Sequence, residues 1–237
     1  MFIRVAVLLF AAILSPGAAV ADPVALSRGL LKIAAAQGAR LYSPVNVKQV
    51  MAARHGVVID AGNHFVQARR VVFCTGHETV PGLPSRGTRI TSSWAAATAP
   101  YTDYPRWLDG TLIWEAAKPY LYLRTTQDGR LIVGGEDAAL DSPSYRADTL
   151  AAKARRLKQK TQKLFPGLDV EWSHVWAGAF GESNDGLPRI GPVPDMPHCH
   201  AVMGFGGNGT IYALIAAQMM PGLLAGRAPA DADLFAF

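Results

Sequence analysis

A glycine-rich turn near the carboxyl end of the chain carries the sharpest chemical signal in the sequence. Residues 204–209 read GFGGNG, which matches the G-x-G-x-x-G pattern of dinucleotide-binding turns. A predicted strand over residues 200–205 leads into it and a predicted helix over residues 211–226 follows. Small residues let a ligand approach the backbone closely, and the free N–H groups at the start of a helix attract negative charge. A tight turn that binds nothing explains the same residues equally well.

This turn does not predict a complete dinucleotide site by itself. A complete site needs a second strand after the helix, with an acidic residue near the end of that strand. Asp231 and Asp233 lie at roughly the required offset, but no predicted strand carries them. The turn is therefore interpreted as a helix N-terminus that faces the negatively charged part of a ligand.

Composition and charge exclude several classes of protein. Half of the 237 residues are apolar and 17% are charged, which is typical of a globular chain with a substantial core. The net charge of +5 is small, and the one basic cluster, residues 153–163, is interpreted as the solvent-facing side of a helix, so no nucleic-acid partner is expected. Cys74 and Cys199 show no metal or disulfide spacing, and we expect two unpaired thiols and no metal site.

The first 21 residues allow two interpretations. Arg4, an apolar run over residues 5–14 and the small residues that end at Ala21 have the layout of a secretory signal peptide. The run is too short to span a membrane. In the alternative interpretation the apolar run is a buried strand or loop of a larger fold, and Asp22 caps a helix that begins at Pro23. We expect a cytoplasmic protein, with export through the signal peptide as the alternative.

The remaining pattern predicts an α+β fold. We expect a helix that ends at Gly38, a hairpin around residues 60–63, and an apolar strand over residues 71–74 that is buried on both faces. Short alternating segments then predict an antiparallel sheet, with a hairpin turn at residues 127–129. A long amphipathic helix over residues 144–164 and a strand over residues 170–180 follow.

Taken together and in order, these pieces resemble the D-amino-acid oxidase superfamily, and more narrowly its bacterial members that are similar to glycine oxidase and γ-glutamylputrescine oxidase. The resemblance rests on five segments that cover essentially all of residues 14–237. They are Asp22-Pro23 with Leu30 and Gly38-Ala39, VVFCTG at 71–76, PYLYLRTTQDGRLIVGGE at 119–136, WAGAFGESNDGLPRIG at 176–191, and GFGGNGT at 204–210.

The resemblance implies a fold, a cofactor and an activity. It implies a partial FAD-binding α/β domain over residues 14–80, an antiparallel substrate domain over residues 81–184, and a return to the FAD-binding domain over residues 185–237. It implies non-covalent FAD, since no cysteine stands in residues 180–186, where covalent members carry one. Hydride transfer from an amine-bearing carbon to the flavin is the implied reaction. The cofactor-binding positions carried over are Val47, Thr75, Gly76, Gly206, Gly207, Asn208, Gly209 and Thr210; no catalytic base is assigned.

The sequence departs from the family pattern in two ways. Family members open with a βαβ unit that holds the FAD pyrophosphate, and nothing before Asp22 resembles one, so we expect the chain to lack that segment and to work with a separate FAD-binding half. The arginines that grip a carboxylate in amino-acid-specific members are replaced by Ala179-Phe180 and Gly207.

The second departure favours a small-molecule amine over an α-amino acid as substrate. Tyr120, Tyr122 and Arg124 alternate along one predicted strand, so they share a face and are the candidate substrate-binding residues. Core packing for the tyrosines and a surface position for the arginine are the competing interpretations. A non-catalytic exported protein and an inactive truncated fragment remain as alternative functions.

Overall fold

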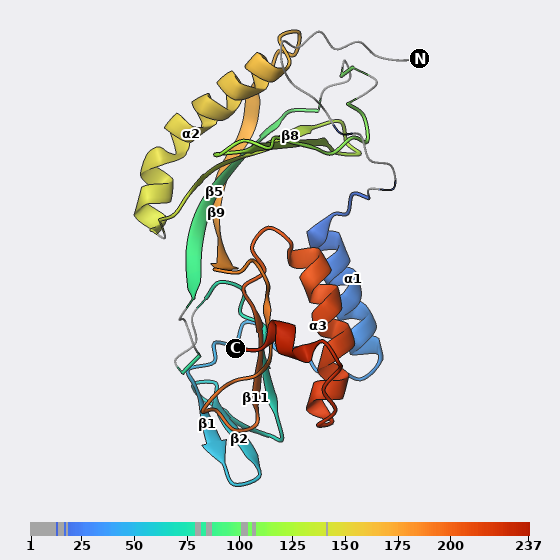
Figure 1. The fold of residues 1–237 in the computed structure, drawn as a ribbon, viewed down its shortest axis with the longest axis vertical. Coiled ribbons are helices and arrows are strands. Elements are labelled where there is room, and N and C mark those ends of the chain that lie inside the picture. Colours follow the sequence, from blue (N-terminus) through green and yellow to red (C-terminus); the bar gives the residue numbers. More distant parts are fainter. Residues whose placement is uncertain are drawn as a thin grey trace.

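The computed structural model describes residues 13, 17, 19–78, 82–83, 87–100, 104–105, 108–140 and 142–237. Most of the proposed signal peptide (residues 1–21) and most of the proline- and glycine-rich stretch at 81–87 lie outside these ranges. The described residues form two lobes that are joined by a pair of long strands (Figure 1). Within these ranges, no helix combines the length and the apolar character needed to cross a membrane.

The upper lobe is a five-stranded antiparallel sheet, as the alternating segments predict. Its strands lie in the order β6-β7-β8-β5-β9. Their bounds are β5 Thr88–Thr98, β6 Ile113–Trp114, β7 Leu121–Thr125, β8 Leu131–Ala138 and β9 Trp172–Ser183. Helix α2 (Pro143–Leu164) covers one face of the sheet (Figure 1). Its Leu157 packs against Leu121, Leu123 and Val133 in the core of this lobe.

Helix α2 forms where the amphipathic pattern predicts it. Ser142 caps it by accepting a hydrogen bond from the backbone N–H of Tyr145, and Pro143 fits the first turn. The expectation that its basic residues all face solvent is wrong for Lys153. The Lys153 side chain is buried, and its ammonium group lies 4.4 Å from the centre of the Trp94 ring, beside the buried Glu136.

The lower lobe contains two three-stranded sheets. One has the order β10-β11-β4, from β4 (Val71–Phe73), β10 (Arg189–Pro192) and β11 (Cys199–Met203); the other is β1-β2-β3, from β1 (Gln49–Ala53), β2 (Gly56–Asp60) and β3 (Phe65–Ala68). Helix α3 (Gly209–Leu224) packs on the first sheet through Met219 and Leu223, and a short 3-10 helix (Ala232–Phe235) follows. The predicted hairpin at residues 60–63 is present, between β2 and β3.

Strand β4 is less buried than the sequence predicts. It pairs in parallel with β11 and is the outer strand of its sheet within the described chain. Phe73 is buried, but Val71 and Val72 are only half-buried, because a single neighbouring strand covers them. The apolar run therefore has an unpaired edge.

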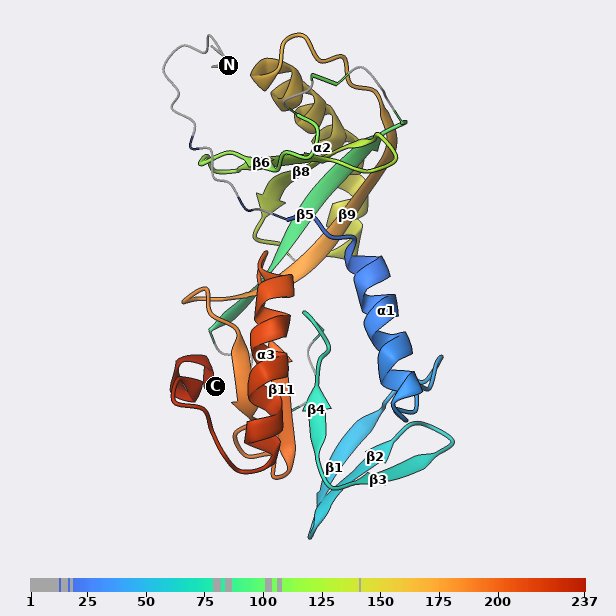
Figure 2. The same cartoon turned by 90° about the vertical axis from the view of Figure 1, so that its right-hand side faces the viewer.

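Helix α1 (Pro23–Ala36) begins and ends at the predicted signals but covers no core. Asp22 accepts hydrogen bonds from Val24 N (2.8 Å) and Ala25 N (3.0 Å), and Gly38 has the positive φ of 95° that ends helices. None of its residues is buried, and its apolar side chains are among the most exposed of the structure, with Leu30 at 58% and Ile33 at 57%. Figure 2 shows α1 set apart from α3, with β4 between them.

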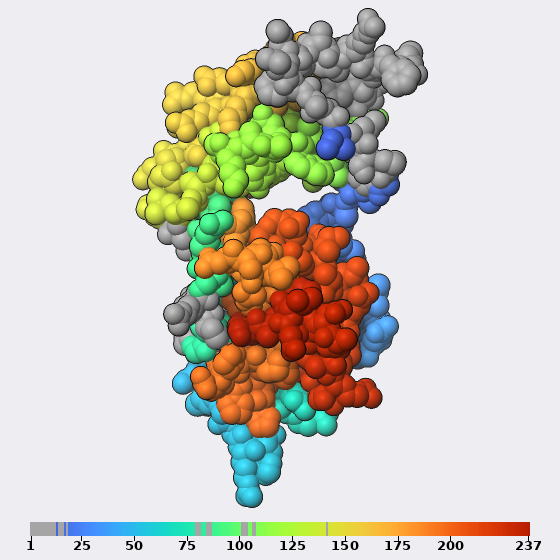
Figure 3. All heavy atoms as spheres, in the orientation of Figure 1, coloured from blue at the N-terminus to red at the C-terminus, as the bar shows by residue number. Residues whose placement is uncertain are grey.

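The two lobes are linked by β5 and β9, which run side by side from the upper sheet into the lower lobe (Figure 2). Figure 3 shows an opening between the lobes, bordered by the green strands of the upper sheet, by the orange surface near α3, and by the blue start of α1. The face of the upper sheet that is turned away from α2 lies above this opening.

Candidate active site

Two turns leave neighbouring parallel strands at the same edge of a sheet. Strands β4 and β11 are paired in parallel, with Phe73 opposite Ala201. Thr75 and Gly76 follow β4, and the glycine-rich turn at residues 204–209 follows β11. Because the carboxyl ends of parallel strands meet at one edge, these turns lie together, which is where open α/β sheets bind their ligands.

The glycine-rich turn presents backbone rather than side chain. Gly204 and Gly206 have φ values of 75° and 51°, which favour glycine. Asn208 stands at the N-cap of α3 but makes no capping hydrogen bond with its side chain. A Cβ atom placed on Gly207 would meet no atom within 4 Å, so open space lies beside this residue. The turn thus leaves room and backbone N–H groups for an electron-rich ligand at the positive end of α3.

The return strand β9 contacts both turns. The carbonyl oxygen of Gly181 accepts a hydrogen bond from Gly206 N at 2.8 Å, and Glu182 forms an isolated β-bridge with Phe205. A Cβ atom on Gly181 would lie 3.6 Å from the Cα atom of His77, which follows the Thr75–Gly76 turn. Three segments that are distant in sequence therefore converge at Gly181.

The predicted cofactor-binding residues fall into two groups. Thr75, Gly76 and residues 206–210 come together at the edge described above. The Thr75 hydroxyl donates to the carbonyl oxygen of Glu78 at 2.9 Å, so it holds its own turn. Val47 lies elsewhere: it precedes β1, its side chain is 51% exposed, and its neighbour Lys48 is bonded to Asp60 of the β2 strand.

The predicted substrate residues lie on the face of the upper sheet that is turned away from α2. Leu121 and Leu123 point into the core beneath α2, so the alternating Tyr120, Tyr122 and Arg124 point to the other side. The two tyrosine rings are 6.1 Å apart. Tyr122 lies directly over Gly134 of β8, where a Cβ atom would come within 2.2 Å of the ring. Gly134 is therefore the residue that makes room for Tyr122.

Further polar residues share this face, and sequence reasoning missed them. Arg89 donates to Glu182 at 2.8 Å, and Thr91 donates to the same carboxylate at 3.3 Å. Asp137 hydrogen-bonds the Tyr120 hydroxyl, and Ser93 hydrogen-bonds that of Tyr122. Period-two alternation along β5 could have found Arg89, Thr91 and Ser93, whereas no local pattern marks Asp137.

Burial keeps both tyrosines protonated. Burial and the nearby Asp137 carboxylate raise the pKa of the Tyr120 hydroxyl well above its usual range. Burial also raises the pKa of Tyr122, against the opposing effect of its hydrogen bond with Ser93. Both side chains are therefore neutral hydrogen-bond donors near pH 7.

Arg124 lies at the far end of this face, away from the glycine-rich turn. Its charge acts on Asp22, the N-cap residue of α1, and helps to lower the pKa of that carboxyl group, although the backbone hydrogen bonds from Ala25 and Val24 contribute more. Arg124 therefore stands near the start of α1.

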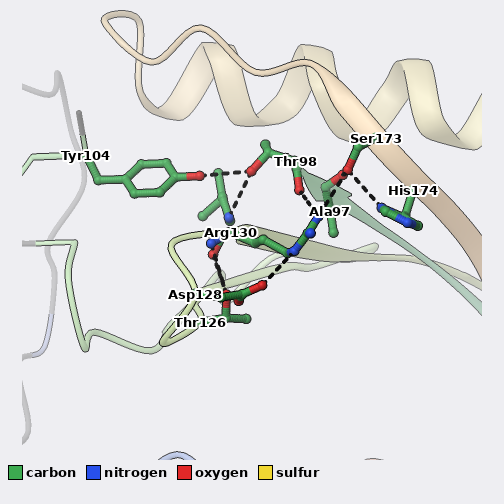
Figure 4. A network of polar contacts seen from close by, with 9 residues as sticks. Ala97, Thr98, Tyr104, Thr126, Asp128, Arg130, Ser173 and His174 are labelled. Carbon is green, nitrogen blue, oxygen red and sulfur yellow. Dashed lines mark hydrogen bonds and ion pairs between the residues drawn. The ribbon is translucent and has the colours of Figure 1, made fainter. Parts of the chain in front are cut away.

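A second polar network, at the outer end of the upper sheet, serves structure rather than chemistry. Arg130 donates to the carbonyl oxygen of Thr98 (3.1 Å) and to Asp128 (2.8 Å), which fastens the β7–β8 hairpin to the end of β5 (Figure 4). Ser173 and His174 are 2.8 Å apart through Oγ and Nδ1, but both are exposed and adjacent in one strand. Within the described residues, no group of three or more potential ligands is placed to hold a metal ion.

Comparison with known proteins decides the family. The sequence profile of the FAD dependent oxidoreductase family (DAO) matches residues 5–221. The chain belongs to this FAD-dependent oxidoreductase family. The resemblance that the five segments predicted is thereby confirmed, and FAD is the cofactor that the family uses.

Individual relatives agree with this assignment. The probable oxidoreductase OrdL of Rhizobium meliloti (strain 1021) is 27% identical over 210 residues, which cover 86% of this chain and 47% of OrdL. The glycine oxidase of Pseudomonas putida is 31% identical over 110 residues, 46% of this chain and 29% of that protein. The chain thus spans about half the length of the first of these relatives, and less of the second.

Solved structures of other proteins share the fold of this chain. L-proline dehydrogenase from P. horikoshii superimposes with a TM-score of 0.75 at 19% identity, over 91% of this chain and 59% of that one. Glycine oxidase from Geobacillus kaustophilus gives 0.73 at 20% identity, over 89% and 56%. The mixed architecture with antiparallel sheets is therefore the family's architecture, and the α+β prediction is confirmed.

The glycine-rich turn fits the flavin of such a protein. The open space beside Gly207 and the uncapped start of α3 suit a planar, electron-rich ring that approaches backbone N–H groups. The residues that would contact it belong to the turn after β11 and the turn after β4.

Proposed function

We propose that this chain takes part in the FAD-dependent oxidation of an amine, with residues 206–210 beside the flavin and Tyr120 and Tyr122 lining the substrate site. In this reaction the amine-bearing carbon loses a hydride and the nitrogen loses a proton, and water then converts the imine to a carbonyl compound and releases the nitrogen. FAD, when bound, supplies the acceptor for the hydride. The chain's own residues bind and orient the amine.

The main support for this proposal is that the sheet face with Tyr120 and Tyr122 lies near the glycine-rich turn. Glu182 touches the turn: the Cγ atom of Glu182 would lie 3.5 Å from a Cβ atom on Gly206. Tyr120 lies near enough for the charge of Glu182 to act on its hydroxyl group. A substrate between the tyrosines and the turn would contact both.

An amine is favoured over an α-amino acid by the charges on this face. A carboxylate substrate needs an arginine with free N–H groups near the reacting carbon. Arg89 already pairs with Glu182 at 2.8 Å, and Arg124 lies at the opposite end near Asp22. Apart from Arg89, the groups on this face that lie toward the turn are the Glu182 carboxylate and the tyrosine rings, which suit a cation.

We further propose that α1, α3 and the free edge of β4 dock a further FAD-binding segment, supplied by a longer chain or by a separate polypeptide. The relatives of the same fold carry additional chain, since this one matches 56–59% of their length. α1 buries none of its residues, Ile211 and Leu214 of α3 are 61% and 58% exposed, and no described strand pairs with the second edge of β4. A segment that adds a strand beside β4 would cover all three.

Two measurements test these proposals separately. The purified chain is incubated with FAD, desalted, and examined by visible absorption, with amines then added under anaerobic conditions. Retained flavin bands that bleach with an amine support the oxidase proposal, and retained flavin bands that no amine bleaches contradict it. Co-expression with the amino-terminal part of a relative then tests docking: co-elution that Leu30→Asp abolishes supports it, and independent elution overturns it.

A further inference from the structure

Asp137 and Glu136 are adjacent in β8 but lie on opposite faces of the sheet. Glu136 faces α2, where its carboxylate lies 2.6 Å from Lys160, 3.5 Å from Lys153 and 3.6 Å from Arg156. The register between β5 and β8 shifts between Ser92 and Trp94, next to this pair. Asp137 therefore lies with Tyr120 and Tyr122 on the face above the opening, and its charge acts on both hydroxyl groups.

The Asp137 carboxylate has an oxygen that the described protein leaves without a partner. Its Oδ1 atom is buried and accepts no hydrogen bond, although Tyr120 bonds the same carboxylate. No basic side chain of the described residues forms an ion pair with Asp137, in contrast to Glu136 and Glu182. A buried carboxylate oxygen without a donor is unfavourable and uncommon in native proteins, so this atom is suited to accept a hydrogen bond from a ligand.

The surroundings of this oxygen indicate what would bind it. The missing group must donate a hydrogen bond, and positive charge would balance the carboxylate. The rings of Tyr120 and Tyr122 are 6.1 Å apart, and their hydroxyl oxygens, which Asp137 influences, can accept a hydrogen bond from such a group. An ammonium group meets each of these conditions, whereas a carboxylate or an alkyl chain does not.

The position of Asp137 along the face separates it from the reacting carbon. Glu182 contacts the glycine-rich turn. The charges of Asp137 and Glu182 both raise the pKa of the Tyr120 hydroxyl group, and those of Asp137 and Arg124 act on the Tyr122 hydroxyl group. In the sheet, β8 with Asp137 is separated by β5 from β9, whose Glu182 touches the turn, and the tyrosines lie farther out beside β7. A group bound at Asp137 lies away from the carbon that is oxidised at the turn.

We infer that Asp137 binds a second, protonated amino group of the substrate, which is therefore a diamine or a longer polyamine rather than a monoamine. This inference rests on the proposed amine oxidation, because it assigns the distal part of the same substrate site. The amine that loses hydride reacts as its free base, whereas the distal nitrogen stays protonated against Asp137.

Binding without turnover tests this inference. The chain incubated with FAD is titrated anaerobically with 1,4-diaminobutane, butylamine and 4-aminobutan-1-ol, by calorimetry and by thermal shift. We expect diaminobutane to bind at least tenfold more tightly than either monoamine, and Asp137→Asn to remove that preference while leaving the monoamines within about twofold. Asp148→Asn, which removes an exposed charge from α2 on the opposite face, is the matched control and keeps the preference.

A stability readout distinguishes a binding role from a structural one. Because Asp137 Oδ1 has no partner, Asp137→Asn should leave the melting temperature without ligand unchanged or raise it, and should abolish the increase caused by diaminobutane. A lower melting temperature in Asp137→Asn, or an equal diaminobutane response in both proteins, overturns the inference. Tyr120→Phe changes a neighbouring side chain but keeps the Asp137 carboxylate, and it should retain the preference for the diamine. That result would show that a substitution on this face does not remove the preference merely by disturbing the fold.

The outcome is separable from that of the oxidase proposal. Asp137-dependent binding of diaminobutane without flavin bleaching would support the diamine site and contradict the oxidation. In the opposite outcome, butylamine and diaminobutane bleach the flavin at equal concentrations, and Asp137→Asn changes neither concentration. That result would support the oxidation and overturn the diamine site.

Discussion

The backbone N–H of Gly206 donates a hydrogen bond to the carbonyl oxygen of Gly181 at 2.8 Å, and this bond fastens the long strand β9 to the glycine-rich turn. Because β9 is also a strand of the upper sheet, the position of the turn is coupled to the face that carries Tyr120 and Tyr122. We therefore expect substitutions in the turn to affect flavin binding and substitutions in the upper sheet to affect stability.

Replacing Gly207 should separate flavin binding from stability. A Cβ atom there meets no protein atom within 4 Å, so Gly207→Ala should change the free energy of unfolding by no more than about 0.5 kcal/mol. The methyl group would enter the space assigned to the flavin, and we expect at least a tenfold weaker retention of FAD, measured by flavin absorbance after desalting. Gly167→Ala, which also meets open space but lies beyond α2, is the control. Equal FAD retention in the two variants would contradict the placement of the flavin.

Replacing Gly134 should displace Tyr122. A Cβ atom on Gly134 would lie 2.2 Å from the Tyr122 ring, so Gly134→Ala forces the ring to move and should destabilise the protein by about 1–3 kcal/mol. Gly178→Ala in strand β9 of the same sheet meets no atom within 4 Å and should be nearly neutral. Urea unfolding of both variants measures the difference, and similar midpoints would show that Tyr122 does not lie over Gly134.

The carboxylate of Glu136 should make stability depend on pH. Burial would raise the pKa of Glu136, but its hydrogen bond with Lys160 and the charges of Lys160 and Lys153 outweigh burial and hold the pKa below its ordinary value of 4.5. A lowered folded-state pKa means that the stabilisation is fully present above pH 4.5 and is lost as the pH falls through the folded-state value.

Substitution of the same residue checks this dependence. Glu136→Gln leaves three cations without their carboxylate and should lower the free energy of unfolding by about 2 kcal/mol at pH 7. The difference from the wild type should shrink as the pH falls below 4.5, in urea titrations across that range. Glu171→Gln is the control, because the Glu171 carboxylate is exposed and pairs with Lys158. This substitution should have only a small effect both at pH 7 and below pH 4.5. A difference that is constant with pH would show that Glu136 is not charged in the folded state.

The two cysteines should differ in reactivity. Cys74 is exposed, whereas Cys199 is 3% exposed, and neither is in a disulfide. A thiol reagent should modify one cysteine per chain rapidly and the second only after unfolding. Cys74→Ser should remove the rapid phase without changing the melting temperature. Two rapid phases would place Cys199 at the surface.

The sequence alone determined features that depend on neighbouring residues. Asp22 caps α1, Gly38 ends it, and the turn at residues 60–63 joins two strands, because capping and turn conformation are set by a few adjacent residues. The glycine-rich turn and the order of the five family segments likewise predicted the family. The domain boundaries at 80 and 184, and the role of each predicted site residue, stay predictions.

Only the tertiary structure decided which side chains share a face. Period-two alternation placed Tyr120 and Tyr122 together, but it could not show that Asp137 joins them while Glu136 turns to α2, because the register shift between Ser92 and Trp94 involves another strand. Similarly, the helical pattern assigned Lys153 to solvent, whereas packing against Trp94 and the neighbouring Glu136 buries it. These contacts join residues that are far apart in sequence, and pairing between distant segments is set by the whole fold rather than by local propensity.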